Sequence, residues 1–136
     1  MPNQSRVQGI GGVFFRAGDP ASLARWYCDH LGVPLEGGAE EDGEGSVSAV
    51  FKWRDAENPD RQGSTVWALF PTDTKYLGDG PVMINYRVDD LDAVLAALES
   101  EGVWIDPERG DYEYGRFAWI KDPEGNRIEL WQPLGE

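Results

Sequence analysis

The feature that most constrains this sequence is a four-residue turn, 122–125, which reads Asp-Pro-Glu-Gly and separates two runs of alternating residues. Proline fixes φ at the second position of such a turn, and glycine accepts the left-handed conformation that closes it. We therefore predict a β-hairpin with strands at 116–121 and 126–131. Two strands that pair across a short turn have a defined register, so the hairpin also predicts which side chains share a face.

Glu129 is the main candidate for a functional residue. Along the second strand of the hairpin, Ile128 and Leu130 point to one face and Glu129 to the other, which predicts that Glu129 lines a cavity. There it would act as a general base or anchor a cationic or hydroxylated ligand. The alternative is a structural carboxylate paired with Arg16 or Arg87, because a buried charge is costly unless it has a partner. The sequence leaves both readings open.

The predicted elements occur twice in the same order, β-α-β-β-β, in a first module at about 9–71 and a second at about 81–133. The residues repeat as well: 14–19 aligns with 85–90, 51–53 with 117–119, and 66–71 with 128–133. Each module would leave one sheet face uncovered, so two modules are expected to pair around a shared cleft. The predicted fold class is α+β within a single domain.

Both predicted helices have start and stop signals. Asp19-Pro20 begins the first helix and Gly32 ends it; Asp89 or Asp90 begins the second and Gly102 ends it. The apolar stripes expected to face the core are Leu23, Trp26, Tyr27 and Leu31, and Leu91, Val94, Leu95 and Leu98. A short strand is expected after each helix, at 33–35 and 103–105. The segments 37–46 and 106–114 read as loops.

Charge and composition exclude several partners. The chain has 12 basic and 25 acidic residues, a net charge of −13. A field of this sign repels nucleic acid and anionic membranes, so neither is expected as a partner. No apolar run is long enough to span a membrane, and no leader sequence is recognisable. The single Cys28 cannot form an internal disulfide, which agrees with a cytoplasmic location.

Three segments carry a resemblance to a known family: 13–32, with its strand–Asp-Pro–helix–Leu-Gly pattern; 87–92, Arg-Val-Asp-Asp-Leu-Asp; and 122–130, Asp-Pro-x-Gly-Asn-x-x-Glu-Leu. In these the chain resembles the vicinal oxygen chelate superfamily of glyoxalase I, extradiol dioxygenases, and bleomycin- and fosfomycin-resistance proteins. The resemblance implies two βαβββ modules whose mixed sheets curl around a central cavity, with helices outside. It also implies a homodimer.

In that superfamily His and Glu side chains of the first and fourth strand of each module hold a divalent metal. Carried over, these positions are Gly12, Trp67, Met83 and Glu129. Only Glu129 is of a ligand type, because glycine has no side chain, indole nitrogen only donates and a thioether suits soft metals. We therefore expect no cofactor, and a divalent metal is disfavoured.

Other acidic and imidazole groups do not complete a metal site. His30 falls in the last turn of the first helix, where a structural role is favoured. The acidic residues Glu40, Glu41, Asp42 and Glu44 would bind calcium weakly or, as we favour, form a solvated loop.

The candidate ligand-binding residues follow from the predicted cavity face and from the loop 106–114, the best candidate for a lid. They are Phe14, Arg16, Trp67, Met83, Asn85, Arg87, Tyr112 and Tyr114. Trp67 would stack on a flat or cationic ligand or pack in the core. Arg16 and Arg87 would bind an anionic group or solvate the strand ends.

Three functions remain open. The first is a metal-independent protein that binds a small aromatic or cationic molecule. The second is a lyase, isomerase or dioxygenase-like enzyme that uses Glu129 in a rebuilt site, with or without a metal. The third is a fold used for dimerisation or partner contacts, which would need a core filled by tryptophans. We favour the first.

Overall fold

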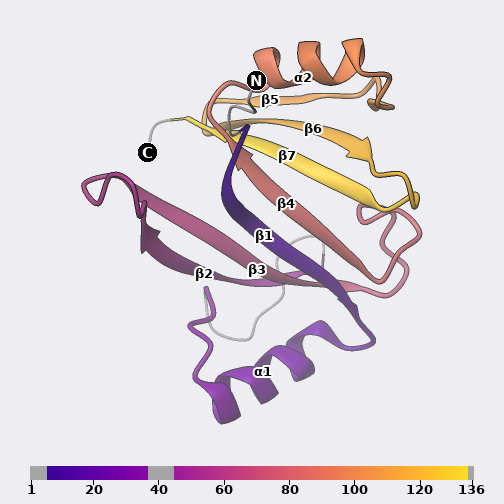
Figure 1. Cartoon of the computed structure of the whole chain (residues 1–136). Helices are drawn as coiled ribbons and strands as arrows, with labels where there is room; N and C mark the ends of the chain where they lie inside the picture. The colour runs from indigo at the N-terminus through magenta and orange to yellow at the C-terminus, as the bar shows by residue number, and fades with distance from the viewer. Residues whose placement is uncertain (1–5, 37–44, 135–136) are drawn as a thin grey trace. The chain divides into compact units, whose positions relative to one another are not determined.

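The computed structural model describes residues 6–36 and 45–134 and has the predicted α+β class (Figure 1). Its elements, in chain order, are β1 (Val7–Ala17), α1 (Pro20–Leu31), β2 (Val47–Arg54), β3 (Gln62–Pro71), β4 (Val82–Val88), α2 (Leu91–Ser100), β5 (Gly110–Tyr112), β6 (Gly115–Lys121) and β7 (Arg127–Pro133). The acidic residues between 40 and 44 lie outside the described part, so their prediction stays open. Neither described helix has the length and apolarity needed to cross a membrane.

The chain divides into two compact units, each built around one repeat. The first unit is Gly12–Val82, and the second combines Met1–Gly11 with Met83–Glu136. In the first, β3 lies between β2 and β1, antiparallel to β2 and parallel to β1. In the second, β7 lies parallel to β4 and antiparallel to β6, which pairs with β5. The first and last strands of each repeat are thus parallel neighbours.

The short strands expected after the helices are reduced to single bridges, Leu35 with Ala49 and Ile105 with Ile120. The prediction of a loop over 106–114 is wrong in part, because Gly110–Tyr112 forms β5 and pairs with β6. An isolated three-residue strand has too little alternation to be recognised in sequence. Pairing with the neighbouring β6 is what makes these three residues a strand.

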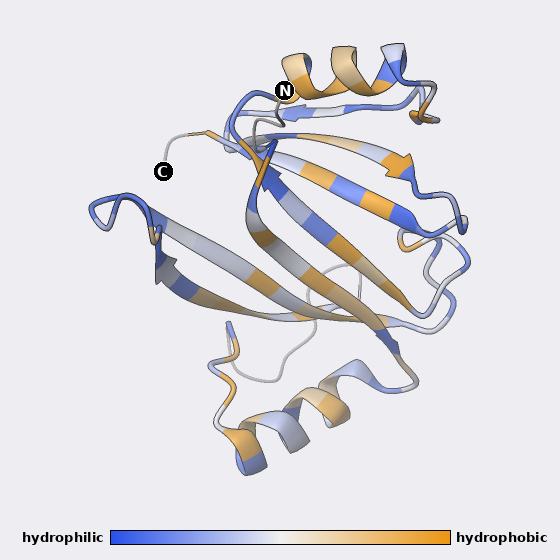
Figure 2. Ribbon diagram, in the orientation of Figure 1, coloured by the Kyte–Doolittle hydropathy of each residue, from blue (hydrophilic) through white to orange (hydrophobic). Residues whose placement is uncertain are grey.

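One face of the sheet in the second unit is covered by α2. Leu91 and Val94 of the helix pack with Ala118, Ile120 and Leu130 of the strands in a buried cluster, and Leu95, Leu98 and Ile128 pack against it. All four residues of the predicted stripe on this helix contact the core. Figure 2 shows polar and apolar residues alternating along β7, and its Ile128 and Leu130 are the residues that pack with α2. The opposite face of this sheet carries Glu129.

The core of the first unit lies between α1 and the strands β2 and β3 (Figure 1). The predicted stripe of α1 is wrong in part, because Ala24 is fully buried whereas Trp26 is 51% and Leu31 66% exposed. Trp26 lies about 200° around the helix axis from Ala24, and so on the far side. The predicted stripe consists of large apolar side chains and omits Ala24, a small residue that packs in the core. Cys28 on the same helix is also exposed.

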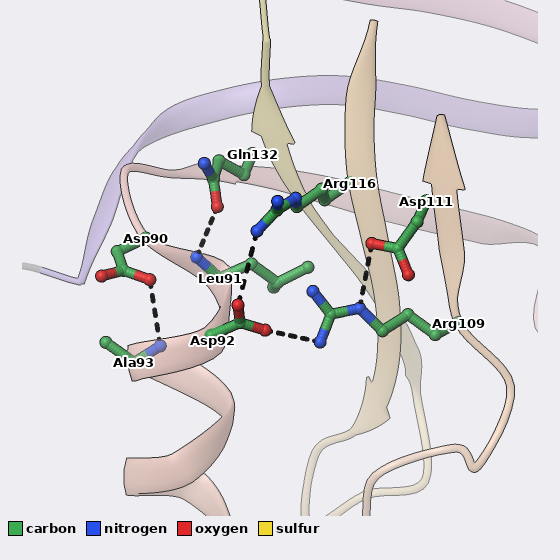
Figure 3. Close-up of polar contacts among 8 residues, drawn as sticks. All are labelled: Asp90, Leu91, Asp92, Ala93, Arg109, Asp111, Arg116 and Gln132. Atoms are coloured by element: carbon green, nitrogen blue, oxygen red, sulfur yellow. Dashed lines mark hydrogen bonds and ion pairs between the residues drawn. The ribbon is translucent and has the colours of Figure 1, made fainter. Parts of the chain in front are cut away.

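The helix starts and stops were predicted correctly. Asp19 caps α1 by accepting a hydrogen bond from Ser22 N, Pro20 follows it, and Gly32 ends the helix at φ 69°. Asp90, rather than Asp89, caps α2 (Figure 3). These signals are local, which is why the sequence alone identifies them.

The first turn of α2 is tied to the strands by side-chain contacts. Gln132 Oε1 accepts from Leu91 N at 2.9 Å (Figure 3). Asp92 pairs with Arg109 at 2.7 Å and with Arg116 at 3.4 Å. Because Arg109 directly precedes β5 and Arg116 lies in β6, these contacts join the helix start to both strands.

Candidate functional site

The carboxylate of Glu129 is buried, with 1% of the residue exposed, and both oxygens are held by neutral donors. Oε1 accepts from Asn85 Nδ2 at 2.6 Å, and Oε2 accepts from Trp119 Nε1 at 2.9 Å. Asn85 lies beside Glu129 in the parallel pairing of β4 with β7, and Trp119 lies opposite it in the hairpin. These two bonds fix the orientation of the carboxylate.

Aromatic rings and arginines surround this carboxylate on the face of the sheet opposite α2. We call this surface the Glu129 face; its residues are Asn85, Arg87, Phe117, Trp119, Glu129 and Trp131. The rings of Phe117 and Trp131 stack with centroids 6.0 Å apart. The guanidinium of Arg87 lies 5.0 Å from the centroid of the Trp131 ring. The face thus combines a carboxylate with flat apolar surfaces and a cation.

A second layer holds Trp119 in place. The guanidinium of Arg127 lies 5.5 Å from the centroid of the Trp119 ring and donates to Asp106 Oδ2 at 3.1 Å. The other Asp106 oxygen accepts from Glu108 N at 2.9 Å. Asp106 thereby fixes Arg127, and Arg127 covers the indole that donates to Glu129.

The pKa of Asp106 lies below its ordinary value, first because the backbone N–H of Glu108 donates to it and then because of Arg127. A carboxyl with a lowered pKa stabilises the fold above its unfolded pKa, near 4, and this contribution is lost as the pH falls through the folded value. We expect Asp106→Asn to lower the free energy of unfolding by about 1 kcal/mol at pH 7.

This difference should shrink when denaturant unfolding is repeated as the pH falls from about 4 to about 3. Glu113→Gln removes an equal charge at an exposed position and is the control. A loss for Asp106→Asn that is the same at pH 7 and pH 3 would show that its charge is not involved.

Gly11 leaves room for the amide of Asn85. A Cβ at this position would come within 2.2 Å of Asn85 Oδ1 and 2.9 Å of Arg87 Cγ and Trp131 Cε3. Asn85 Oδ1 is buried and accepts no hydrogen bond from any described residue. The amide therefore commits its donor to Glu129 and retains an unused acceptor beside Gly11.

The register of β3 corrects the assignment of Trp67. In the second unit Asn85 lies beside Glu129, whereas in the first unit its repeat equivalent, Phe14, lies beside Ala68. The residue of the first repeat that matches Glu129 is therefore Ala68, and the predicted match with Trp67 is wrong by one position. A shift of one residue moves a side chain to the other face of the sheet.

Trp67 packs on the helix side of its sheet. Its ring lies 5.7 Å from that of Phe15 and 5.1 Å from that of Tyr27 on α1, both in edge-to-face contact. Of its two predicted roles, these contacts support packing, and stacking on a ligand stays a prediction.

Arg16, predicted either to bind an anionic group or to solvate the strand end, does neither. Its guanidinium donates to the backbone carbonyls of Thr72, Thr74, Gly78 and Gly80. An arginine whose donors are taken up in this way is a structural residue. The partners lie more than fifty residues away, so no local pattern reveals them.

The remaining predicted site residues fall into two groups. Met83 and Arg87 are buried, and Arg87 belongs to the Glu129 face. Tyr112 and Tyr114 are 53% and 63% exposed; their rings stack 5.3 Å apart and both meet Phe117 edge-on. The two tyrosines thus extend the aromatic surface outward from Phe117.

The residues at the four metal-ligand positions do not fit a hard or borderline metal ion. Gly12 offers no side chain, and a Cβ there would lie 2.7 Å from the Phe14 ring. With the corrected register the other three are Ala68, Met83 and Glu129, of which only the last carries a suitable donor. Within residues 6–36 and 45–134, no three His, Cys, Asp or Glu side chains form a group that could hold a metal.

The model of the Glyoxalase/Bleomycin resistance protein/Dioxygenase superfamily matches residues 9–130. The chain belongs to this superfamily. Over 50 residues, or 36% of this chain, it is 40% identical to the uncharacterized protein YaeR of Escherichia coli K12. That match spans 39% of YaeR, well under half of its length.

Solved structures of the superfamily share the fold over nearly the whole chain. Methylmalonyl-CoA epimerase from Mycobacterium tuberculosis is 25% identical, with a TM-score of 0.60 over 98% of this chain and 93% of that one. A variant of the Streptomyces coelicolor methylmalonyl-CoA epimerase, in complex with 2-nitronate-propionyl-CoA, is 20% identical, with a TM-score of 0.64 over 93% and 98%. A superfamily member from Vibrio splendidus 12B01 is 12% identical, with a TM-score of 0.58 over 90% and 97%.

Sequence reasoning missed Trp119 as a partner of Glu129. The hairpin contains the signal, because counting back from the turn 122–125 pairs Lys121 with Arg127 and Trp119 with Glu129. The roles of Asp106 and Gly11 carry no comparable signal, since their contacts come from segments far apart in sequence.

Proposed function

We propose that this protein binds a small aromatic or cationic molecule on the Glu129 face without a metal. The observation that carries the proposal is the buried Glu129 carboxylate, which two neutral donors orient beside aromatic rings. A negative charge next to aromatic surfaces favours an organic cation over an anion of the same shape. The donor types at the four family positions support a site that works without a metal.

Three probes of similar size separate the contributions of charge and ring. Benzyltrimethylammonium carries an aromatic ring and a cation, benzyl alcohol is neutral, and benzoate is an anion. We expect titration calorimetry to rank their affinities in this order. The measurement uses about 0.15 M salt, which screens the net charge of −13 so that the contacts of each probe at the site decide the ranking. Equal affinities for all three, or binding of benzoate alone, would contradict the proposal.

Glu129→Gln tests the anchor. The side-chain amide can keep both bonds, accepting from Trp119 and donating to Asn85 Oδ1 once the Asn85 amide has turned over. We expect the affinity for benzyltrimethylammonium to fall about tenfold and that for benzyl alcohol to stay the same. Glu124→Gln removes the same charge from the exposed turn and should leave both affinities unchanged.

A second candidate is an isomerase or epimerase, or another enzyme of the superfamily, with Glu129 as base. The 25% identity to methylmalonyl-CoA epimerase over nearly the whole chain favours it. In methylmalonyl-CoA, the Glu129 carboxylate would take the proton from the carbon between the two carbonyl groups, which leaves the electron pair in an enolate. A proton would then return to the same carbon.

Deuterium uptake distinguishes the two candidates. Methylmalonyl-CoA incubated with the protein in D₂O would gain one deuterium, detected by mass spectrometry, and Glu129→Gln would abolish the exchange. No uptake above the protein-free rate would exclude this activity and leave the binding proposal standing. The homodimer and the cytoplasmic location expected from the sequence stay predictions; sedimentation of the purified protein would test the first.

A further inference from the structure

The loop 72–80, which follows β3, turns its backbone carbonyls inward onto one side chain. Arg16 Nε donates to Gly80 O at 3.0 Å, and Nη1 donates to Thr72 O at 2.9 Å and to Thr74 O at 2.7 Å. Nη2 donates to Gly78 O. The loop also has turns of its own, with Thr74 N donating to Pro71 O and Gly78 N to Lys75 O. A single guanidinium therefore joins both ends and the middle of this connection.

Converging carbonyl oxygens are the kind of arrangement that binds cations. Each carbonyl has a partial negative charge, and a buried carbonyl needs a partner. Guanidinium suits such a ring of acceptors because its N–H groups lie in one plane and point outward from all three nitrogens. Asp73, Asp79 and Lys75 line the same hollow, so two carboxylates and one ammonium group lie beside the carbonyls.

We infer that the loop 72–80 is a guanidinium-binding cage whose resident cation is the Arg16 side chain. The loop would owe its conformation to this ion rather than to its own sequence. When the side chain is truncated, the cage would accept a free guanidinium ion in its place. This inference rests on contacts within the first unit and does not depend on the proposed function.

The cage also positions an aromatic cluster. Tyr76, in the middle of the loop, stacks on Phe70 with ring centroids 5.6 Å apart, and its ring lies 6.5 Å from that of Phe14. Leu77, the next residue, is fully buried. Loss of the ion should therefore release Tyr76 and Leu77 together with the carbonyls, so that the segment opens as one piece.

The experiment measures hydrogen exchange of the segment 72–80 by mass spectrometry in the full-length protein. Arg16→Ala should exchange about tenfold faster than the wild type in this segment. About 20 mM guanidinium chloride should restore the protection, with a midpoint of about 1–10 mM, as expected for so small a ligand. This is far below the molar concentrations at which the salt denatures proteins.

Two control compounds separate the charge of guanidinium from its planar array of N–H donors. Urea has the same planar shape without the charge, and sodium chloride has charge without the N–H donors, so neither should restore protection. Arg54→Ala is the control variant, because Arg54 also donates to a backbone carbonyl, that of Pro59, but in the connection that precedes β3. This variant should neither expose the segment 72–80 nor respond to guanidinium. Arg16→Lys, which keeps the charge with fewer donors, should fall between Arg16→Ala and the wild type.

Two results would overturn the inference: unchanged protection of the segment in Arg16→Ala, or increased exchange that guanidinium does not reverse. If Arg16→Ala fails to fold, circular dichroism with and without guanidinium replaces hydrogen exchange. Recovery of folding with guanidinium but not with urea would then support the cage, and no recovery would refute it.

Discussion

Replacing Glu129 by alanine is expected to lower the free energy of unfolding by about 3–5 kcal/mol. The substitution removes a fully buried side chain and leaves a cavity. It also leaves the Asn85 amide and the Trp119 indole without the acceptor they now share, and each unpaired buried donor costs about 1–3 kcal/mol. Urea unfolding followed by circular dichroism measures the loss.

Glu129→Gln is the matched control for this prediction. It fills the same volume and offers an acceptor to Trp119 and a donor to Asn85, so the loss should stay below about 1.5 kcal/mol. Similar losses for alanine and glutamine would mean that the charge itself stabilises the fold. Glu129 would then be part of a structural ion pair, and the proposed anchor would lose its support.

Trp67→Ala is expected to cost about 3 kcal/mol and to leave the binding of benzyltrimethylammonium unchanged. The tryptophan packs edge-to-face on Phe15 and on Tyr27 of α1, so its removal separates the helix from its sheet. The side chain is only partly buried, which places the loss at the low end of the range for large aromatic residues.

Trp26→Ala provides the comparison, because this tryptophan is half exposed on the outer side of the same helix. Its loss should stay within about 0.5 kcal/mol. A change in ligand affinity for Trp67→Ala, without a similar loss of stability, would restore the predicted role of this residue in binding. Calorimetry and urea unfolding on the same preparations give both quantities.

Features that depend on neighbouring residues could be predicted from the sequence. The Asp-Pro-Glu-Gly turn closes through Gly125 at φ 86°, and Asp122 accepts from the backbone of Glu124 and Asn126, as turn chemistry requires. The hairpin then sets the face on which Glu129 lies. Local pattern alone therefore identifies the face of Glu129, whereas Asn85 becomes its neighbour through the pairing of β4 with β7.

Features that depend on distant pairing were missed or misplaced. In β3 both faces carry apolar side chains, Val66, Ala68 and Phe70 on one and Trp67 and Leu69 on the other, so alternation does not indicate the buried face. Only the pairing with β1 decides it. The contacts of Arg16 with the loop 72–80 depend on tertiary structure in the same way.

The corrected register has an evolutionary consequence. Every alanine codon becomes a glutamate or an aspartate codon by a single base substitution, so the first repeat is genetically one step away from a second carboxylate at Ala68. That step would place a charge beside the ring of Phe14, where the second repeat has the amide of Asn85. The order of mutations therefore matters: a lineage that restored this symmetry would first have to exchange the ring for a hydrogen-bond donor.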